Sequence, residues 1–136
     1  MSCPGITQCI AVGYYADHAN LGHILTVAEL WNGTAWSLQP TAEPTGAGQS
    51  YLFGVSCTSS NICTAVGASV PVTGSSVGTL IERKHGARWA VQPTPNLAGA
   101  VYSSLSGISC PAITACVTVG FYLSGSGAYV PLAEQY

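Results

Sequence analysis

The residues of this chain best suited to acid–base chemistry are three recurring glutamates. Glu29, Glu82 and Glu134 each follow two apolar residues at the same place in three similar segments. Glycoside hydrolysis uses two carboxylates that lie about 5–9 Å apart. Because the glutamates recur once per segment, we expect them to stand too far apart for that reaction. We expect them instead to accept hydrogen bonds from backbone or indole N–H groups.

A second candidate for chemistry is the cluster of Asp17, His18 and His23. Such a group could bind a metal or act as acid and base. Nothing equivalent occurs in the other two segments, and no Gly-x-Ser-x-Gly motif supplies a serine nucleophile. We therefore assign no catalytic residue, no metal ligand and no cofactor. A glycoside-acting hydrolase that uses Glu29 with Glu82, or His18 with His23, remains an alternative.

The six cysteines fall into three pairs, each with five residues between its members. Zinc sites usually show two-residue spacings with histidines nearby in the sequence, which this pattern does not match. A five-residue loop between adjacent antiparallel strands brings two cysteines within disulfide reach. We therefore predict the disulfides Cys3–Cys9, Cys57–Cys63 and Cys110–Cys116.

Disulfides persist in oxidising compartments, so we expect an extracellular, secreted protein. The N-terminus lacks the basic and long apolar regions of a signal peptide. We interpret the chain as a mature fragment or as part of a longer chain.

The elements that position these residues are set by an internal repeat of about 53 residues. Each copy contains Ser-Cys-x5-Cys and then Val-Gly three residues later. A four-residue segment that ends in glutamate comes next in each copy. In two copies this segment is followed by the motif Trp-x2-Gln-Pro-Thr. The copies are repeat 1 (1–50), repeat 2 (51–103) and the partial repeat 3 (104–136), and together they make one repeat domain, 1–136.

Repeat 2 predicts four antiparallel strands, at residues 51–57, 62–69, 78–84 and 88–92. Asn32-Gly33 is a strong hairpin signal, because a type I′ turn needs positive φ at both positions. Residues 16–30 could instead hold a short helix. The period and the strand content indicate an all-β, β-propeller-like repeat of four-stranded antiparallel blades, with about two and a half blades per chain.

The repeat resembles that of the secreted tandem-repeat proteins common in actinobacteria. Their unit runs roughly S-C-x-S-x-x-x-C-x-A-V-G, then T-L-A-E-R-W-N-G-T-x-W-x-x-Q-P-T-P-N. Here it appears at residues 2–13, 26–40, 52–67, 79–96 and 105–120. The resemblance implies a β-propeller-like fold, and most of those proteins carry no assigned activity.

The low charge limits the classes of partner. Charged residues make up 6% of the chain, the net charge is −2, and Lys and Arg total three. A groove that follows phosphates needs more cations, so we expect no nucleic acid partner. No apolar stretch approaches the ~18 residues of a membrane span. Ten predicted strands cannot close one ring, so we expect a homo-oligomer or a filament, with a monomeric fragment as the alternative.

Five aromatic residues are candidates for ligand binding. Variable loops on a constant scaffold usually carry recognition, and the segments after Val-Gly vary most between repeats. The candidates are Tyr14, Tyr15, Trp31, Phe121 and Tyr122. Trp36 and Trp89 recur, so we expect them to pack between blades.

The sequence thus predicts a non-catalytic extracellular repeat module for binding or structural self-assembly. Its ligand would be a glycan or another extracellular protein. A lectin-like carbohydrate-binding propeller is an alternative.

Overall fold

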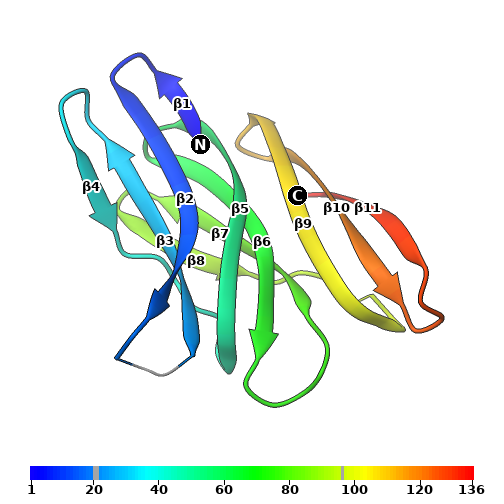
Figure 1. The fold of residues 1–136 in the computed structure, drawn as a ribbon. Coiled ribbons are helices and arrows are strands. Elements are labelled where there is room, and N and C mark those ends of the chain that lie inside the picture. Colours follow the sequence, from blue (N-terminus) through cyan, green and yellow to red (C-terminus); the bar gives the residue numbers. More distant parts are fainter. Residues whose placement is uncertain (20–21, 96) are drawn as a thin grey trace.

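The structure is a computed structural model that describes residues 1–19, 22–95 and 97–136. All the regular secondary structure within these residues is β-strand, so the expected all-β class is confirmed. The strands form an eight-stranded sheet and a three-stranded sheet, which do not close into a ring (Figure 1). The strands are β1 (Ser2–Gly5), β2 (Gln8–Asp17), β3 (His23–Trp31), β4 (Trp36–Gln39), β5 (Ala47–Ser59), β6 (Ile62–Pro71), β7 (Gly78–His85), β8 (Arg88–Gln92), β9 (Ala100–Ala112), β10 (Ala115–Ser124) and β11 (Tyr129–Gln135).

The sheets consist of three antiparallel units that correspond to the sequence repeats. Unit 1 comprises β1–β4, unit 2 comprises β5–β8 and unit 3 comprises β9–β11. Units 1 and 2 join through parallel pairing of Ile24 with Gln49, and units 2 and 3 meet through a parallel bridge from Val77 to Tyr102. The two bridges use equivalent positions of the repeat. Figure 1 shows the three units side by side in chain order.

Unit 2 contains the four strands that the sequence predicts, although β5 begins at Ala47, four residues before the predicted start. Residues 16–30 contain the end of β2 and most of β3, so the alternative of a helix is wrong for the described part of this stretch. Residues 20 and 21 lie outside the described residues. Unit 1 also has one strand more than expected, because β1 pairs with β2 through Ser2 and Gly5.

The expected positive φ at Asn32 is wrong. Gly33 has φ 98°, but no described residue other than glycine has a positive φ. The turn is held instead by the Asn32 side chain, whose Oδ1 accepts hydrogen bonds from the backbone N–H groups of Thr34 and Ala35, at 3.0 and 2.9 Å. An asparagine that caps its own turn in this way does not need the left-handed conformation.

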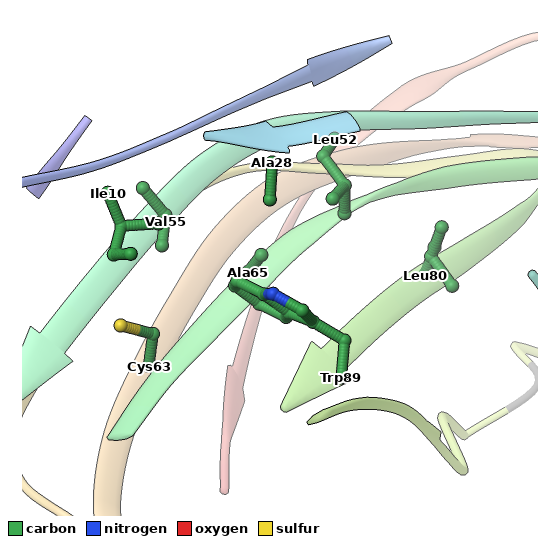
Figure 2. Close-up of a cluster of buried hydrophobic side chains, with 8 residues drawn as sticks. All are labelled: Ile10, Ala28, Leu52, Val55, Cys63, Ala65, Leu80 and Trp89. Carbon is green, nitrogen blue, oxygen red and sulfur yellow. The ribbon is translucent and has the colours of Figure 1, made fainter. Parts of the chain in front are cut away.

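The hydrophobic core lies between the units. Successive side chains along a strand point to opposite faces of the sheet. In β6, Ala65 therefore faces unit 1 and the next residue, Val66, faces unit 3. Figure 2 shows the first cluster, with the Trp89 ring reaching toward Ala65. The cluster between units 1 and 2 contains Ile10, Ala28, Leu52, Val55, Cys63, Ala65, Leu80 and Trp89, and the cluster between units 2 and 3 contains Val66, Ile81, Leu105 and Leu132. Unit 2 therefore has both faces covered.

The three predicted disulfides are confirmed, one in each unit. They are Cys3–Cys9, Cys57–Cys63 and Cys110–Cys116, with Cα–Cα distances of 4.0, 4.0 and 4.1 Å. Cys57 and Cys63 are direct partners in the ladder between β5 and β6. Each disulfide therefore ties the first strand of its unit to the second strand at the connecting turn.

Candidate functional site

The surfaces that stand out are the two outer sheet faces at the ends of the three-unit array. In β3, Ala28 is buried against unit 2, so Val27 points to the opposite face. In β11, Leu132 is buried against unit 2, and Ala133 points outward and is exposed. We call the outer face of unit 1 the leading face and the outer face of unit 3 the trailing face.

Two apolar positions of the repeat are buried where a neighbouring unit covers them, and their equivalents on the end faces are exposed. Trp89 in unit 2 is 7% exposed, whereas the equivalent Trp36 on the leading face is 44% exposed. Val66 in unit 2 is 0% exposed, whereas the equivalent Val119 on the trailing face is 51% exposed. The end faces therefore present the kind of apolar side chains that pack between units, but no neighbouring unit covers them in this structure.

The leading face is mostly apolar, although it includes Glu29, and it is hollowed. It consists of β2, β3 and β4 and presents Tyr15, Leu25, Val27, Trp31, Trp36 and Leu38. Tyr15, Leu25, Val27 and Leu38 contribute to the lining of an open hollow of about 640 Å³. At the other end of β3, the rings of Trp31 and Trp36 lie 5.6 Å apart.

The trailing face is also apolar and carries a row of aromatic rings. It presents Val117, Val119, Phe121, Tyr129 and Ala133 from β10 and β11. The Phe121 ring lies 5.6 Å from Tyr102 and 5.6 Å from Tyr129. Because Tyr129 is exposed, this row opens to solvent.

A repeated polar contact links each unit to the next. Ser2 Oγ accepts a hydrogen bond from the backbone N–H of Cys57, and Ser56 Oγ accepts one from Cys110, both at 3.0 Å. These serines precede the first cysteine of their own units. Ser109 occupies the same position in unit 3. A fourth unit on the trailing face could therefore be linked in the same way.

The structure does not bring the five sequence-predicted binding residues together. Tyr15 and Trp31 lie on the leading face, and Phe121 lies on the trailing face. Tyr14 contacts unit 2, with its ring 4.8 Å from that of Tyr51. Tyr122 packs against the core between units 2 and 3.

Sequence reasoning missed the valines of the trailing face and Leu38 of the leading face. Their signal was present in the repeat. Val119 is equivalent to Val66, and the alternation of Val117, Val119 and Phe121 is that of a strand with one apolar face.

The three recurring glutamates differ in their burial and in their hydrogen-bond partners. Glu82 is fully buried, and its Oε2 accepts a hydrogen bond of 3.1 Å from the backbone N–H of Ala42 in unit 1. Glu134 accepts a hydrogen bond from the hydroxyl of Tyr136. Glu29 lies on the leading face. The expected backbone bond is thus confirmed at Glu82. The indole bond is not found, since Trp89 Nε1 has no partner among the described residues.

Asp17 and His23 lie at the end of the β2–β3 hairpin. Asp17 pairs with His23 across β2 and β3, and Asp17 Oδ1 accepts a hydrogen bond of 3.0 Å from the backbone N–H of Ala19. In residues 1–19, 22–95 and 97–136, no three His, Cys, Asp or Glu side chains are placed to hold a metal ion together.

Burial raises the pKa of the Glu82 carboxyl to about 7, and the nearby Glu43 adds to the rise. The backbone N–H of Ala42 and the nearby Thr26 side chain act in the opposite direction. The single hydroxyl proton of Thr26 is donated to Glu43 Oε1 at 2.9 Å, and the same side chain lies beside the Glu82 carboxyl. These groups lie between units 1 and 2, where they couple protonation to the packing of the units.

Stability is expected to fall as the pH rises from about 5 to about 8. The folded state keeps the Glu82 proton up to a pH of about 7, whereas the unfolded chain releases it near the ordinary pKa of 4.5. Because the folded state binds more protons in this window, the free energy of unfolding decreases by about 3 kcal/mol across it. Urea unfolding at the two pH values measures the change. Glu82→Gln should remove most of it, and Glu29→Gln should not. Equal pH profiles for wild type and Glu82→Gln would contradict this account.

Comparison of the chain with family models, with curated proteins and with solved structures finds no match. Across the described residues, no helix is long and apolar enough to cross a membrane.

Proposed function

We propose that this chain is a non-catalytic, extracellular repeat module with β-propeller-like blades, and that it assembles head to tail with further copies of itself. In this assembly the trailing face of one copy covers the leading face of the next. The proposal also places the chain with the secreted tandem-repeat proteins that its motif resembles.

The observation that carries the proposal is the exposure of interface residues at the ends of the array. Trp36 and Val119 are exposed at positions where Trp89 and Val66 are buried by a neighbouring unit. The two faces are complementary by repetition, since their equivalents already pack against each other between units 1 and 2 and between units 2 and 3. Association of such unlike faces is head to tail, and it gives a ring if the angle closes and a filament otherwise.

Three disulfides support the extracellular location, because disulfide bonds persist in oxidising compartments. The surroundings of the glutamates support a non-catalytic role. Glu82 is buried and bonded to the backbone of unit 1, so it serves packing between units.

Sedimentation velocity tests the assembly. The chain has a mass of 13.9 kDa. The oxidised protein is expected to show a weight-average mass that rises with concentration over the micromolar to millimolar range. A protein that stays monomeric at all these concentrations would contradict self-assembly.

A lectin-like role is the second candidate, because the row of Tyr102, Phe121 and Tyr129 offers exposed ring surface for stacking on sugars. A glycan array separates the two functions. Binding that is lost in Tyr129→Ala would support the lectin, and absence of binding to any glycan would count against it.

A further inference from the structure

A pocket of about 380 Å³ lies at the end of unit 2 opposite the Cys57–Cys63 disulfide. Its described lining comes from the connection that leads into β5, from the strand ends around the β6–β7 connection, and from the start of β9 with the connection before it. All of these residues lie between positions 44 and 103, so the middle of the chain builds the pocket. The volume is within the range of about 300–1,000 Å³ that is usual for small-molecule sites.

Five hydroxyl side chains border this pocket, and none of them has a hydrogen-bond partner among the described residues. Ser103 is only 6% exposed, and its position is fixed by its backbone N–H, which donates to the Val77 carbonyl oxygen at 2.8 Å. Buried polar groups in proteins are almost always hydrogen-bonded, so a ligand in the pocket would find these hydroxyl groups free to bond. The five residues are Thr45, Ser69, Ser76, Thr79 and Ser103.

The repeat shows which side chains leave room for the pocket. Ser69 and Gly78 are partners in the β6–β7 ladder, and both border the pocket. The equivalent pairs are Tyr15 with Leu25 in unit 1 and Tyr122 with Val130 in unit 3. A Cβ added at Gly78 would meet no atom within 4 Å. Unit 2 therefore has the smallest pair of the three at the place where the pocket lies.

The position of Ser103 also differs from its equivalent in the preceding unit. Ser50 occupies that position in unit 2, where it is 0% exposed and its Oγ is enclosed with no partner among the described residues. Ser50 does not border the pocket, whereas Ser103 does. The two serines therefore form a matched pair in which only one can reach a ligand.

The lining selects an uncharged ligand with several hydroxyl groups. None of the described lining side chains is ionisable or aromatic. An ionised ligand would lose its hydration there without gaining a counter-charge. Serine and threonine hydroxyl groups each donate and accept hydrogen bonds, as sugar hydroxyl groups do. The rings of Pro44, Pro71 and Pro95 offer apolar surface for the C–H face of a sugar ring.

We propose that this pocket binds a neutral sugar of one or two rings. The inference goes beyond the proposed assembly, because the pocket lies on neither end face. The site is also separate from the aromatic row of Tyr102, Phe121 and Tyr129, since none of these rings borders the pocket.

The test is a titration of the oxidised, ¹⁵N-labelled chain with D-glucose, D-galactose, D-mannose, cellobiose and lactose, followed by NMR. At least one of these sugars is expected to give saturable shifts of the backbone amides at residues 45–47, 76–79 and 100–103, with a Kd of about 1 mM. D-glucuronate carries a carboxylate in place of a glucose hydroxymethyl group. It should bind at least about tenfold more weakly than the neutral sugars, because no cation in the lining compensates its charge.

Two variants should weaken the binding by about tenfold or more. Gly78→Leu introduces the side chain that unit 1 has at Leu25, and Ser103→Ala removes the buried hydroxyl group while the backbone bond to Val77 remains. Ser50→Ala is the matched control and should bind like wild type. All three variants should keep a cooperative thermal transition.

The inference would be overturned by the absence of saturable shifts with every sugar, by equal binding of glucose and glucuronate, or by unchanged affinity in both pocket variants. Binding that is lost in Tyr129→Ala and kept in both pocket variants would place the sugar on the aromatic row, which also overturns it. Gly78→Leu leaves both end faces intact, so its self-association should match that of wild type. Failure of assembly and failure of sugar binding are therefore separate results.

Discussion

Replacing Gly67 with alanine is expected to lower the free energy of unfolding by about 4 kcal/mol or more. The new methyl group would lie 1.8 Å from the carbonyl oxygen of Tyr51, which belongs to the backbone of β5. Neither strand can move aside, because β6 is buried on both faces between units 1 and 3. Urea unfolding followed by tryptophan fluorescence measures the loss.

The repeat supplies its own control for this prediction. Gly13→Ala makes the same substitution in the same Val-Gly motif, but the nearest atom to the new methyl group is 3.7 Å away. Its effect should be smaller than about 1 kcal/mol and stabilising, since alanine reduces the entropy of the unfolded chain. Gly120→Ala should resemble Gly67→Ala. Similar losses at Gly13 and Gly67 would show that the approach of the first strand is not what these glycines serve.

A single arginine on either end face is expected to weaken self-association by about 100-fold or more. Val119→Arg changes the trailing face and Leu38→Arg changes the leading face, each at an exposed side chain, so the fold of the monomer should be unaffected. Head-to-tail contact would bury the charge of Val119→Arg without a partner. Leu38→Arg would place an arginine opposite Glu29 in the β3–β4 ladder, so the contact would have to bury a bulky ion pair in place of the leucine. Ile6→Arg, in the exposed turn between β1 and β2, is the matched control and should assemble like wild type. Sedimentation velocity of the three variants at equal concentration measures the effect.

The repeat made the local structure predictable. The spacing of the cysteines was enough to pair Cys57 with Cys63, because two such residues in adjacent antiparallel strands are necessarily close. The expectation that the recurring tryptophans pack between units is confirmed for Trp89 and wrong for Trp36, which is exposed. Alternating apolar residues located the strands of unit 2 to within a few residues.

The sequence does not reveal which copies of a repeated residue are covered by a neighbouring unit. Trp36 and Trp89 have the same motif around them, but one is exposed and the other buried, because only unit 2 has a unit on that side. Glu82 and Glu134 likewise differ through their neighbours. The residue after Thr41 is Ala42, which donates its N–H to Glu82, whereas the residue after Thr94 is Pro95, which has no N–H. The turn at Asn32 was misjudged because its side chain replaces the backbone geometry that the Asn-Gly pair usually signals.

Mixing the two end-face variants tests the central claim, head-to-tail assembly through complementary faces, most directly. Leu38→Arg keeps an intact trailing face and Val119→Arg keeps an intact leading face, so each alone should be monomeric in sedimentation velocity. An equimolar mixture should form a complex of twice the monomer mass and grow no further, because every remaining face is blocked. A mixture in which both variants stay monomeric, or a single variant that assembles like wild type, would contradict the account.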